Sequence, residues 1–186
     1  ITNAATFSTS GAMTGNGANV FANSGTVNVI AGNMTALGSF TNTGTTNITG
    51  RTLGATTVGN SSQMFITNGT VAGAFTNTGT VTVSGASTVS GAFTNNGTAD
   101  LADGVFGDSL TISGLTSGNG TYQLDLNLST GATDLITASG GTAGNVTLQF
   151  ATTGGGVILA PTTVMTGLSG GTGLSFTGLP IGGAIL

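Results

Sequence analysis

The sequence predicts an all-β fold, a right-handed parallel β-helix (β-solenoid) with about 18–20 residues in each coil. A nine-residue pattern, Phe-x-Asn-x-Gly-Thr-x-x-aliphatic, occurs four times, as expected when similar coils stack on one another. The chain has 35 Gly among 186 residues, and long helices are disfavoured because each interior Gly costs a helix about 1 kcal/mol relative to Ala. The β-branched residues Val, Ile and Thr, which fit pleated strands, are prominent between the glycines.

The four copies also predict a fifth through their spacing. They are FANSGTVNV (21–29), FTNTGTTNI (40–48), FTNTGTVTV (75–83) and FTNNGTADL (93–101), and the middle Phe-to-Phe step is close to twice the other two. We therefore expect a degenerate copy between the second and third, with GATTVGN (54–60) and MFITNGTVAG (64–73) as candidates. Phe7 with Gly11 suggests a further worn copy at the start.

Strand alternation predicts which residues of each copy face the core. In GTVTV, Val81 and Val83 point to one face of the strand, while Thr80 and Thr82 point to the other. Coils stack about 4.8 Å apart, so each inward side chain lies on its counterpart, and burying one contributes roughly 1.5–3 kcal/mol. The expected core ladder consists of Phe21, Phe40, Phe75, Phe93, Val29, Ile48, Val83 and Leu101.

The Asn and Gly of the pattern predict a corner that recurs in every coil. We expect the Asn amides to hydrogen-bond to the turn and to the Asn of neighbouring coils, as in stacked Asn ladders. We expect the Gly two positions later to supply a positive φ without the penalty of a Cβ atom. The predicted corner residues are Asn23, Asn42, Asn77, Asn95, Gly25, Gly44, Gly79 and Gly97.

The pattern stops after Gly104, and longer alternating strands follow. We therefore expect repeat coils at 1–104 and C-terminal β coils at 105–186, continuous with each other as one elongated domain. In the second part, Leu124, Leu126 and Leu128 alternate with polar residues, which is typical of a half-buried strand.

Several short motifs in residues 105–150 resemble a known family. They are Leu110-Thr-Ile112-Ser-Gly114, Gly120-Thr-Tyr122-Gln-Leu124-Asp125, Asp134-Leu135 with Gly140, and Ala143-Gly144-Asn145-Val146-Thr-Leu148. This run resembles the passenger region of autotransporters just upstream of the outer-membrane barrel, while residues 1–104 share only its general Gly/Thr/Asn-rich style. The resemblance implies a secreted bacterial β-helix, displayed or released, whose C-terminal coils help to nucleate folding after export.

The composition excludes most catalytic chemistry. The chain has one Arg, five Asp and no Lys, Glu, His or Cys, so it lacks Ser–His and Cys–His pairs, a Schiff-base lysine and the usual zinc ligands. We therefore expect no enzyme activity and no cofactor. The net charge of −4 without a basic patch argues against nucleic acid. Gly, Thr and Ser interrupt every apolar run before the ~20 residues of a spanning helix, so we expect no membrane insertion by this chain.

Three candidate sites remain, each with a structural alternative. Asp100, Asp103 and Asp108 could bind Ca²⁺ weakly, or form a solvated capping turn where the repeat ends. A hydrolytic site would have to be built from Asp alone or with the single Tyr122 or Arg51. Asp125 and Asp134 could form a carboxylate pair for polysaccharide cleavage, or serve as scaffold residues, which is what the resemblance implies. Outward Thr rows could match an ice lattice, but the row through Thr82 is mixed, with Asn28, Asn47 and Asp100 at the equivalent positions.

These observations together predict a non-catalytic structural protein of the bacterial cell exterior, a rigid surface fibre or adhesin stalk. The expected location is extracellular or on the outer-membrane surface, and the expected partners are a host or neighbouring cell surface, glycans or matrix. One alternative is a subunit of a self-assembling filament that binds copies of itself end to end through open strand edges. An alternative of another class is a glycan-binding or glycan-cleaving β-helix.

Overall fold

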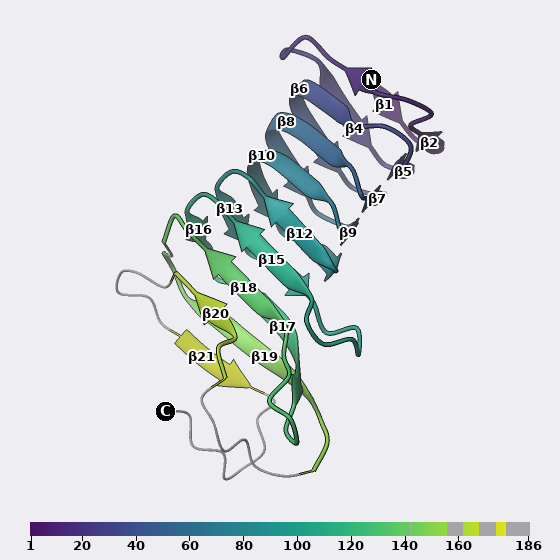
Figure 1. The fold of residues 1–186 in the computed structure, drawn as a ribbon. Coiled ribbons are helices and arrows are strands. Elements are labelled where there is room, and N and C mark those ends of the chain that lie inside the picture. The colour runs from purple at the N-terminus through teal and green to yellow at the C-terminus, as the bar shows by residue number, and fades with distance from the viewer. Residues whose placement is uncertain (142, 156–161, 168–173, 178–186) are drawn as a thin grey trace.

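The fold is built only from strands in the part of the chain that the structure describes. The computed structural model describes residues 1–141, 143–155, 162–167 and 174–177, so parts of the predicted C-terminal section lie outside the described residues. Neighbouring strands in its two sheets run parallel. Figure 1 shows them stacked along one axis as an elongated body, with the N-terminus at one end. The predicted all-β parallel β-helix is therefore confirmed.

The first sheet has twelve strands within the described residues. Nine of them form its main path, in the order β1 (Thr2–Asn3), β4 (Val20–Asn23), β6 (Met34–Asn42), β8 (Thr52–Asn60), β10 (Thr70–Asn77), β12 (Ala86–Val89), β15 (Ser109–Ile112), β18 (Leu135–Ala138) and β20 (Met165–Thr166). Three short strands pair beside this path: β3 (Met13–Thr14), β13 (Phe93–Asn95) and β16 (Thr116–Ser117).

In the part of the chain that the structure describes, the second sheet has nine strands, which also follow the chain order. They are β2 (Thr6–Ser8), β5 (Thr26–Val29), β7 (Thr45–Thr49), β9 (Gln63–Thr67), β11 (Thr80–Ser84), β14 (Thr98–Asp100), β17 (Thr121–Asn127), β19 (Val146–Thr153) and β21 (Leu174–Thr177). The chain moves from one sheet to the other and back, so each coil adds to both sheets.

The coil length changes partway along the stack. One row of the second sheet pairs, in order, Thr6, Thr26, Thr45, Gln63, Thr80, Thr98, Thr121 and Thr147. The steps along this row are nearly even as far as Thr98 and clearly longer after it. The predicted coil length therefore describes the repeat coils, while the later coils are longer. Both sheets nevertheless continue across residue 105, since β12 pairs with β15 and β14 with β17.

The strand register locates the degenerate copy. Val58 pairs with Phe40 on one side and Phe75 on the other, and Asn60 pairs with an Asn of the pattern in both directions. The degenerate copy is thus GATTVGN and the residues directly after it. The other candidate is wrong as an Asn–Gly corner, because Asn68 lies in a different turn, with a φ of 49°.

The worn first copy starts earlier than expected. Phe7 pairs with Val27 and not with Phe21, while Asn3 pairs with Asn23. Phe7 therefore belongs to the second strand of its coil, and the copy begins at Ile1.

The inward residues form one continuous core along the stack. The structure places the predicted ladder residues Phe21, Phe40, Phe75, Phe93, Val29, Ile48, Val83 and Leu101 in this core, each at most 1% exposed. Two pairs of rings stack between adjacent coils, with centroids 5.6 Å apart for Phe21 and Phe40 and 5.0 Å apart for Phe75 and Phe93. The spacing of the coils thus sets the contact distance of the rings.

The corner glycines are required for a reason other than the predicted one. Gly25, Gly44, Gly79 and Gly97 do not adopt positive φ, so that prediction is wrong. A Cβ atom on any of them would come within 3.0 Å of the backbone of the preceding coil. For Gly97 the nearest atom is the carbonyl oxygen of Gly79. Close stacking of one corner on the next therefore excludes a side chain here.

Candidate functional site

A ladder of Asn side chains runs along one corner of the repeat coils. The Nδ2 of every member except the last donates to the Oδ1 of the Asn in the next coil at 2.7–2.9 Å. It also donates to main-chain carbonyl oxygens of its own and the next coil, as Asn77 does to Gly79 at 3.1 Å and to Thr98 at 3.0 Å. The members are Asn3, Asn23, Asn42, Asn60, Asn77 and Asn95. These bonds fasten coil to coil, which is a structural role.

The ladder ends where the coils lengthen. Asn95 is followed in the next coil by Gly118, which has a φ of 103°, and its Nδ2 donates to the Thr121 carbonyl at 3.1 Å. The row of Phe rings ends at the same coil, because Thr116 pairs with Phe93. Thr116 has a small side chain, and the large ring of Tyr122 in the same coil packs against Phe93 in a T-shaped pair, with centroids 6.4 Å apart.

Tyr122 and Arg51 lie in different coils and in different surroundings. Tyr122 is 1% exposed, and its hydroxyl has no hydrogen-bond partner among the described residues. Burial raises the pKa of Tyr122, and the nearby Asn95 side chain lowers it in part. Arg51 is exposed in an earlier coil, where its Nε donates to the Ile30 carbonyl at 3.3 Å. Of the two residues, one thus lies inside the core and the other on the surface.

All five Asp residues of the chain gather around the segment between β14 and β15. We call this group the acidic corner; it comprises Asp100, Asp103, Asp108, Asp125 and Asp134. The segment 101–108 extends from the stack just before β15 (Figure 1). Asp108, Asp125 and Asp134 are 5%, 2% and 0% exposed, while Asp103 is exposed.

The buried carboxylates hold the backbone of this segment. Asp125 Oδ2 accepts from the Gly104 amide at 2.6 Å, and Asp134 Oδ1 accepts from the amides of Gly107 and Asp108, both at 3.1 Å. Asp134 Oδ2 also accepts from the Asp125 amide at 2.8 Å. Three donors of one loop are thus bound by two side chains from later coils.

Asp108 makes the opposite connection, toward an earlier coil. Its Oδ1 accepts from the Gly85 amide at 2.8 Å. Its Oδ2 is buried and has no hydrogen-bond partner among the described residues. A buried unpartnered oxygen on an ionised carboxylate is costly, because nothing replaces the water that it has lost.

The electrostatics of the corner favour the protonated forms. Burial raises the pKa of Asp134 to about 6, and the charges of Asp125 and Asp108 add to this rise, while its backbone hydrogen bonds oppose it. Burial likewise raises the pKa of Asp108 and of Asp100, again with a contribution from neighbouring carboxylates. The cause is common to all three, since negative groups are brought together away from water.

The three residues predicted as a possible Ca²⁺ site, Asp100, Asp103 and Asp108, make different contacts: two bind the turn next to them and one binds an earlier coil. Asp100 caps the turn at Ala102 with a bond of 3.0 Å, and Asp103 caps that at Val105 with a bond of 2.9 Å. Asp108 instead reaches back to Gly85. In the described part of the chain, no three acidic, His or Cys side chains are grouped so that they could hold a metal ion. The capping alternative therefore fits Asp100 and Asp103, while Asp108 is buried and does not belong to a solvated turn.

The predicted carboxylate pair does lie together, but it is closed to solvent. The Asp134 amide approaches the Asp125 carbonyl at 3.3 Å, and the carboxylate of Asp134 accepts from the Asp125 amide. Asp125 and Asp134 are only 2% and 0% exposed. The pair acts on the backbone of its own chain.

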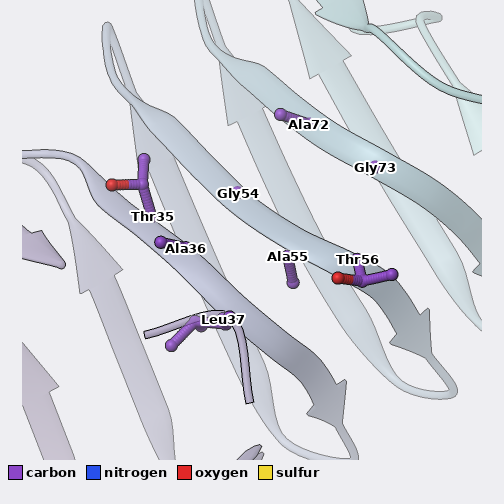
Figure 2. Close-up of a pocket in the computed structure, with 9 residues that line it drawn as sticks. Thr35, Ala36, Leu37, Gly54, Ala55, Thr56, Ala72 and Gly73 are labelled. Carbon is purple, nitrogen blue, oxygen red and sulfur yellow. The ribbon is translucent and has the colours of Figure 1, made fainter. Parts of the chain in front are cut away.

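A shallow groove of about 410 Å³ crosses strands β6, β8 and β10 of the first sheet. Figure 2 shows small side chains along it, including Ala36, Ala55 and Ala72. Bulges shape it: the register shifts between Met34 and Leu37 and again after Ala72, and Ala36 and Gly73 have positive φ. The only side-chain oxygens that line it are the hydroxyls of two Thr residues, Thr35 and Thr56.

The first sheet also contains a row of Thr residues that the sequence did not reveal. Six consecutive strands place Thr in register, in the row Thr52, Thr70, Thr88, Thr111, Thr137 and Thr166. The row through Thr82 in the second sheet is mixed, as expected, and includes the 37% exposed Phe65. The changing coil length hides the first row, because the step from Thr137 to Thr166 is much longer than that from Thr52 to Thr70.

The sequence analysis also missed two members of the Asn ladder, Asn3 and Asn60. It did not predict that all five Asp residues lie together in the acidic corner. Counting 18 residues from Asn42 would have identified Asn60, whereas nothing in the sequence spacing joins Asp134 to Gly107.

The described residues contain no helix with the length and hydropathy that a membrane crossing requires. Comparison with protein-family models, with curated proteins and with solved structures found no match to this chain.

Proposed function

We propose that the chain is a non-catalytic structural protein of the bacterial cell exterior, a rigid β-helical surface fibre or adhesin stalk of the autotransporter-passenger type. The observation that carries this proposal is the continuity of the two parallel sheets from β1 and β2 to β20 and β21. A body whose successive coils are joined by backbone hydrogen bonds resists bending and unfolding, which is the mechanical property of a stalk.

The distribution of polar groups supports the same proposal. The buried Asn ladder and the buried carboxylates of the acidic corner hydrogen-bond to the backbone of their own chain. The outward rows consist largely of Thr, Asn and Ser, so the surface offers neutral hydroxyl and amide groups. Such a surface contacts glycans, matrix or another cell by hydrogen bonding, without the long-range attraction of charge.

Surface display tests the export route. The chain is fused ahead of an autotransporter barrel and expressed in a Gram-negative bacterium, and antibody binding to intact cells is measured. We expect the chain to be accessible outside and to resist added protease. A matched fusion with Gly79→Val, which places a side chain against the preceding corner, should be displayed in a protease-sensitive form. Retention of the unmodified fusion inside the cell would contradict the proposal.

Assays on polysaccharides separate this proposal from the glycan-cleaving alternative. The purified chain should release no product from a panel of bacterial and host polysaccharides. Turnover that is lost in Asp125→Asn and in Asp134→Asn, with both variants still folded by circular dichroism, would establish the enzyme alternative instead.

A self-assembling filament is a second candidate, and the open strand edges favour it. β1 pairs only with β4 and β2 only with β5, so each has one side without a partner strand in the described residues. Asn3 stands at the end of the Asn ladder, where its Oδ1 can accept from the amide of another Asn. A second copy stacked on this edge would continue both sheets, and such a contact is heterologous and does not close.

Electron microscopy of the purified chain tests the filament. Negative staining should show fibres whose length grows with protein concentration, and fusion of a globular domain to the N-terminus should abolish them by covering the edge. A uniform monomer at high concentration would remove this candidate and leave the stalk.

A further inference from the structure

The acidic corner connects the repeat coils to the longer coils. Asp108 binds the amide of Gly85, which follows β11, while Asp125 and Asp134 from later coils bind the amides of Gly104, Gly107 and Asp108. The segment 101–108 is therefore held from both sides by carboxylates. It is also the first insertion that lengthens a coil, between β14 and β15.

The charges in this corner have no cationic partner. The groups that face one another are Asp100 of β14, Asp103 and Asp108 of the segment, Asp125 of β17 and Asp134 before β18. The chain has no Lys or His, its single Arg51 donates to the Ile30 carbonyl, and its N-terminal ammonium donates to the Val20 carbonyl at 2.7 Å. Full ionisation therefore places like charges together without compensation.

We propose that residues 101–108 form a proton-sensitive latch, which docks firmly when the acidic corner takes up protons and opens more often when the corner is fully ionised. The docked form buries the carboxylates of Asp108 and Asp134, which are 5% and 0% exposed, and one oxygen of Asp108 has no hydrogen-bond partner. An open segment returns these two groups to water, where ionisation has no such cost. Protons and docking are therefore linked.

The sign of the linkage follows from the direction of the pKa shifts. The pKa of Asp134 rises from 3.8 to about 6 in the folded chain, and that of Asp108 is also raised. A raised carboxyl pKa means that the docked form binds more protons than the open form between about pH 4 and pH 6. The stabilisation is complete below about pH 4 and is lost as the pH rises through about 6.

Hydrogen exchange of the intact chain tests the latch. Protection factors are measured between pH 4.5 and 8 for the amides of Gly104, Gly107 and Asp108, with correction for the intrinsic exchange rate. We expect protection at pH 4.5 to exceed that at pH 8 by at least about tenfold, the effect of one pKa unit. The amides of Val81 and Val83 in the repeat strand serve as an internal reference and should show no comparable change. Equal protection at both pH values would overturn the proposal.

Two Asp→Asn variants test which carboxylate causes the pH dependence of the protection factors. Asp108→Asn keeps an oxygen for the Gly85 amide and removes the buried charge, so the segment should be more protected at pH 8 and less dependent on pH. Asp103→Asn removes the same charge from an exposed carboxylate and should change the profile less. An Asp108→Asn profile as steep as that of the unmodified chain would overturn the proposal. So would increased protection at pH 8 on addition of CaCl₂, because a cation and not a proton would then neutralise the corner.

Discussion

At the scale of single residues, the repeat is a set of stacking contacts. Asn77 bridges three coils, since it accepts from Asn60 and donates to Asn95, while its Nδ2 also donates to two carbonyl oxygens. Gly79 lies where any side chain would enter the preceding coil. Both residues are specified by their neighbours along the stack and not by the local turn alone.

Replacement of a ladder Asn should destabilise the chain strongly. In Asn77→Ala, the Oδ1 of Asn95 and the carbonyl of Thr98 lose a donor and the Nδ2 of Asn60 loses an acceptor. We expect the free energy of unfolding to fall by about 2–4 kcal/mol, because buried polar groups remain unpaired. Urea denaturation measures this change. Asn47→Ala, which removes one outward Asn–Asn bond, is the matched control and should cost less than about 1 kcal/mol.

Substitution of a corner glycine tests whether close stacking of the coils explains why glycine occupies this position. Gly79→Ala places a Cβ atom against the backbone of Ser62 and should lower the free energy of unfolding by about 1–3 kcal/mol. Gly11→Ala meets nothing within 4 Å and should leave stability unchanged or slightly higher. Equal effects of the two substitutions in thermal denaturation would argue against the stacking explanation.

Ser62 already provides a natural comparison for this corner. It stands at the glycine position of the degenerate copy, and the bond beside it from the Gln63 amide to the Gly44 carbonyl is 3.2 Å long. The equivalent bond from Thr45 to Gly25 is 2.8 Å long. The side chain therefore coincides with a wider local separation of the coils.

At the scale of elements, the junction between the repeat coils and the longer coils is the least uniform part of the core. The row of Phe rings and the Asn ladder both end there, where Thr116 pairs with Phe93 and the ring of Tyr122 also packs against Phe93. Two hydroxyls, those of Thr116 and Tyr122, are buried there without hydrogen-bond partners in the part of the chain that the structure describes. Strand pairing continues through the junction although side-chain stacking changes.

Removal of the Tyr122 hydroxyl should stabilise the chain. Tyr122→Phe keeps the ring against Phe93 and eliminates a buried unpartnered group, so we expect a gain of about 1 kcal/mol in the free energy of unfolding. Thermal denaturation by circular dichroism measures it, with Tyr122→Leu as the variant that also loses the ring and should be destabilised. A loss of stability in Tyr122→Phe would mean that the hydroxyl bonds to Asn95 in solution.

At the scale of the whole molecule, stability is distributed along the stack. Each coil contacts its two neighbours through both sheets, so cutting one connection leaves many backbone bonds in place. The molecule also concentrates its negative charge at one corner, while its single Arg51 lies elsewhere.

Trypsin digestion tests whether neighbouring coils hold one another in place after the chain is cut. The chain contains one tryptic site, at the exposed Arg51, so digestion should give only residues 1–51 and 52–186. We expect both fragments to elute together in size-exclusion chromatography, since the β6–β8 and β7–β9 pairs cross the cut. Arg51→Gln should remain intact under the same digestion. Separation of the two fragments without denaturant would contradict the expected cooperation between coils.

The sequence by itself determined the architecture of the repeat coils. The pattern of FTNTGTVTV predicted the buried ladder, the stacked Asn residues and the approximate coil length, because these contacts recur between identical positions of successive coils. The repeat spacing also predicted the degenerate copy, whose Asn60 the register then located.

Only the tertiary structure decided the role of the glycines, the row of six Thr and the acidic corner. The clash at Gly79 involves an atom of another coil, and Asp134 reaches Gly107 across 27 residues. Once the coils differ in length, residues that share a row no longer share a spacing, so the three-dimensional register alone brings them together.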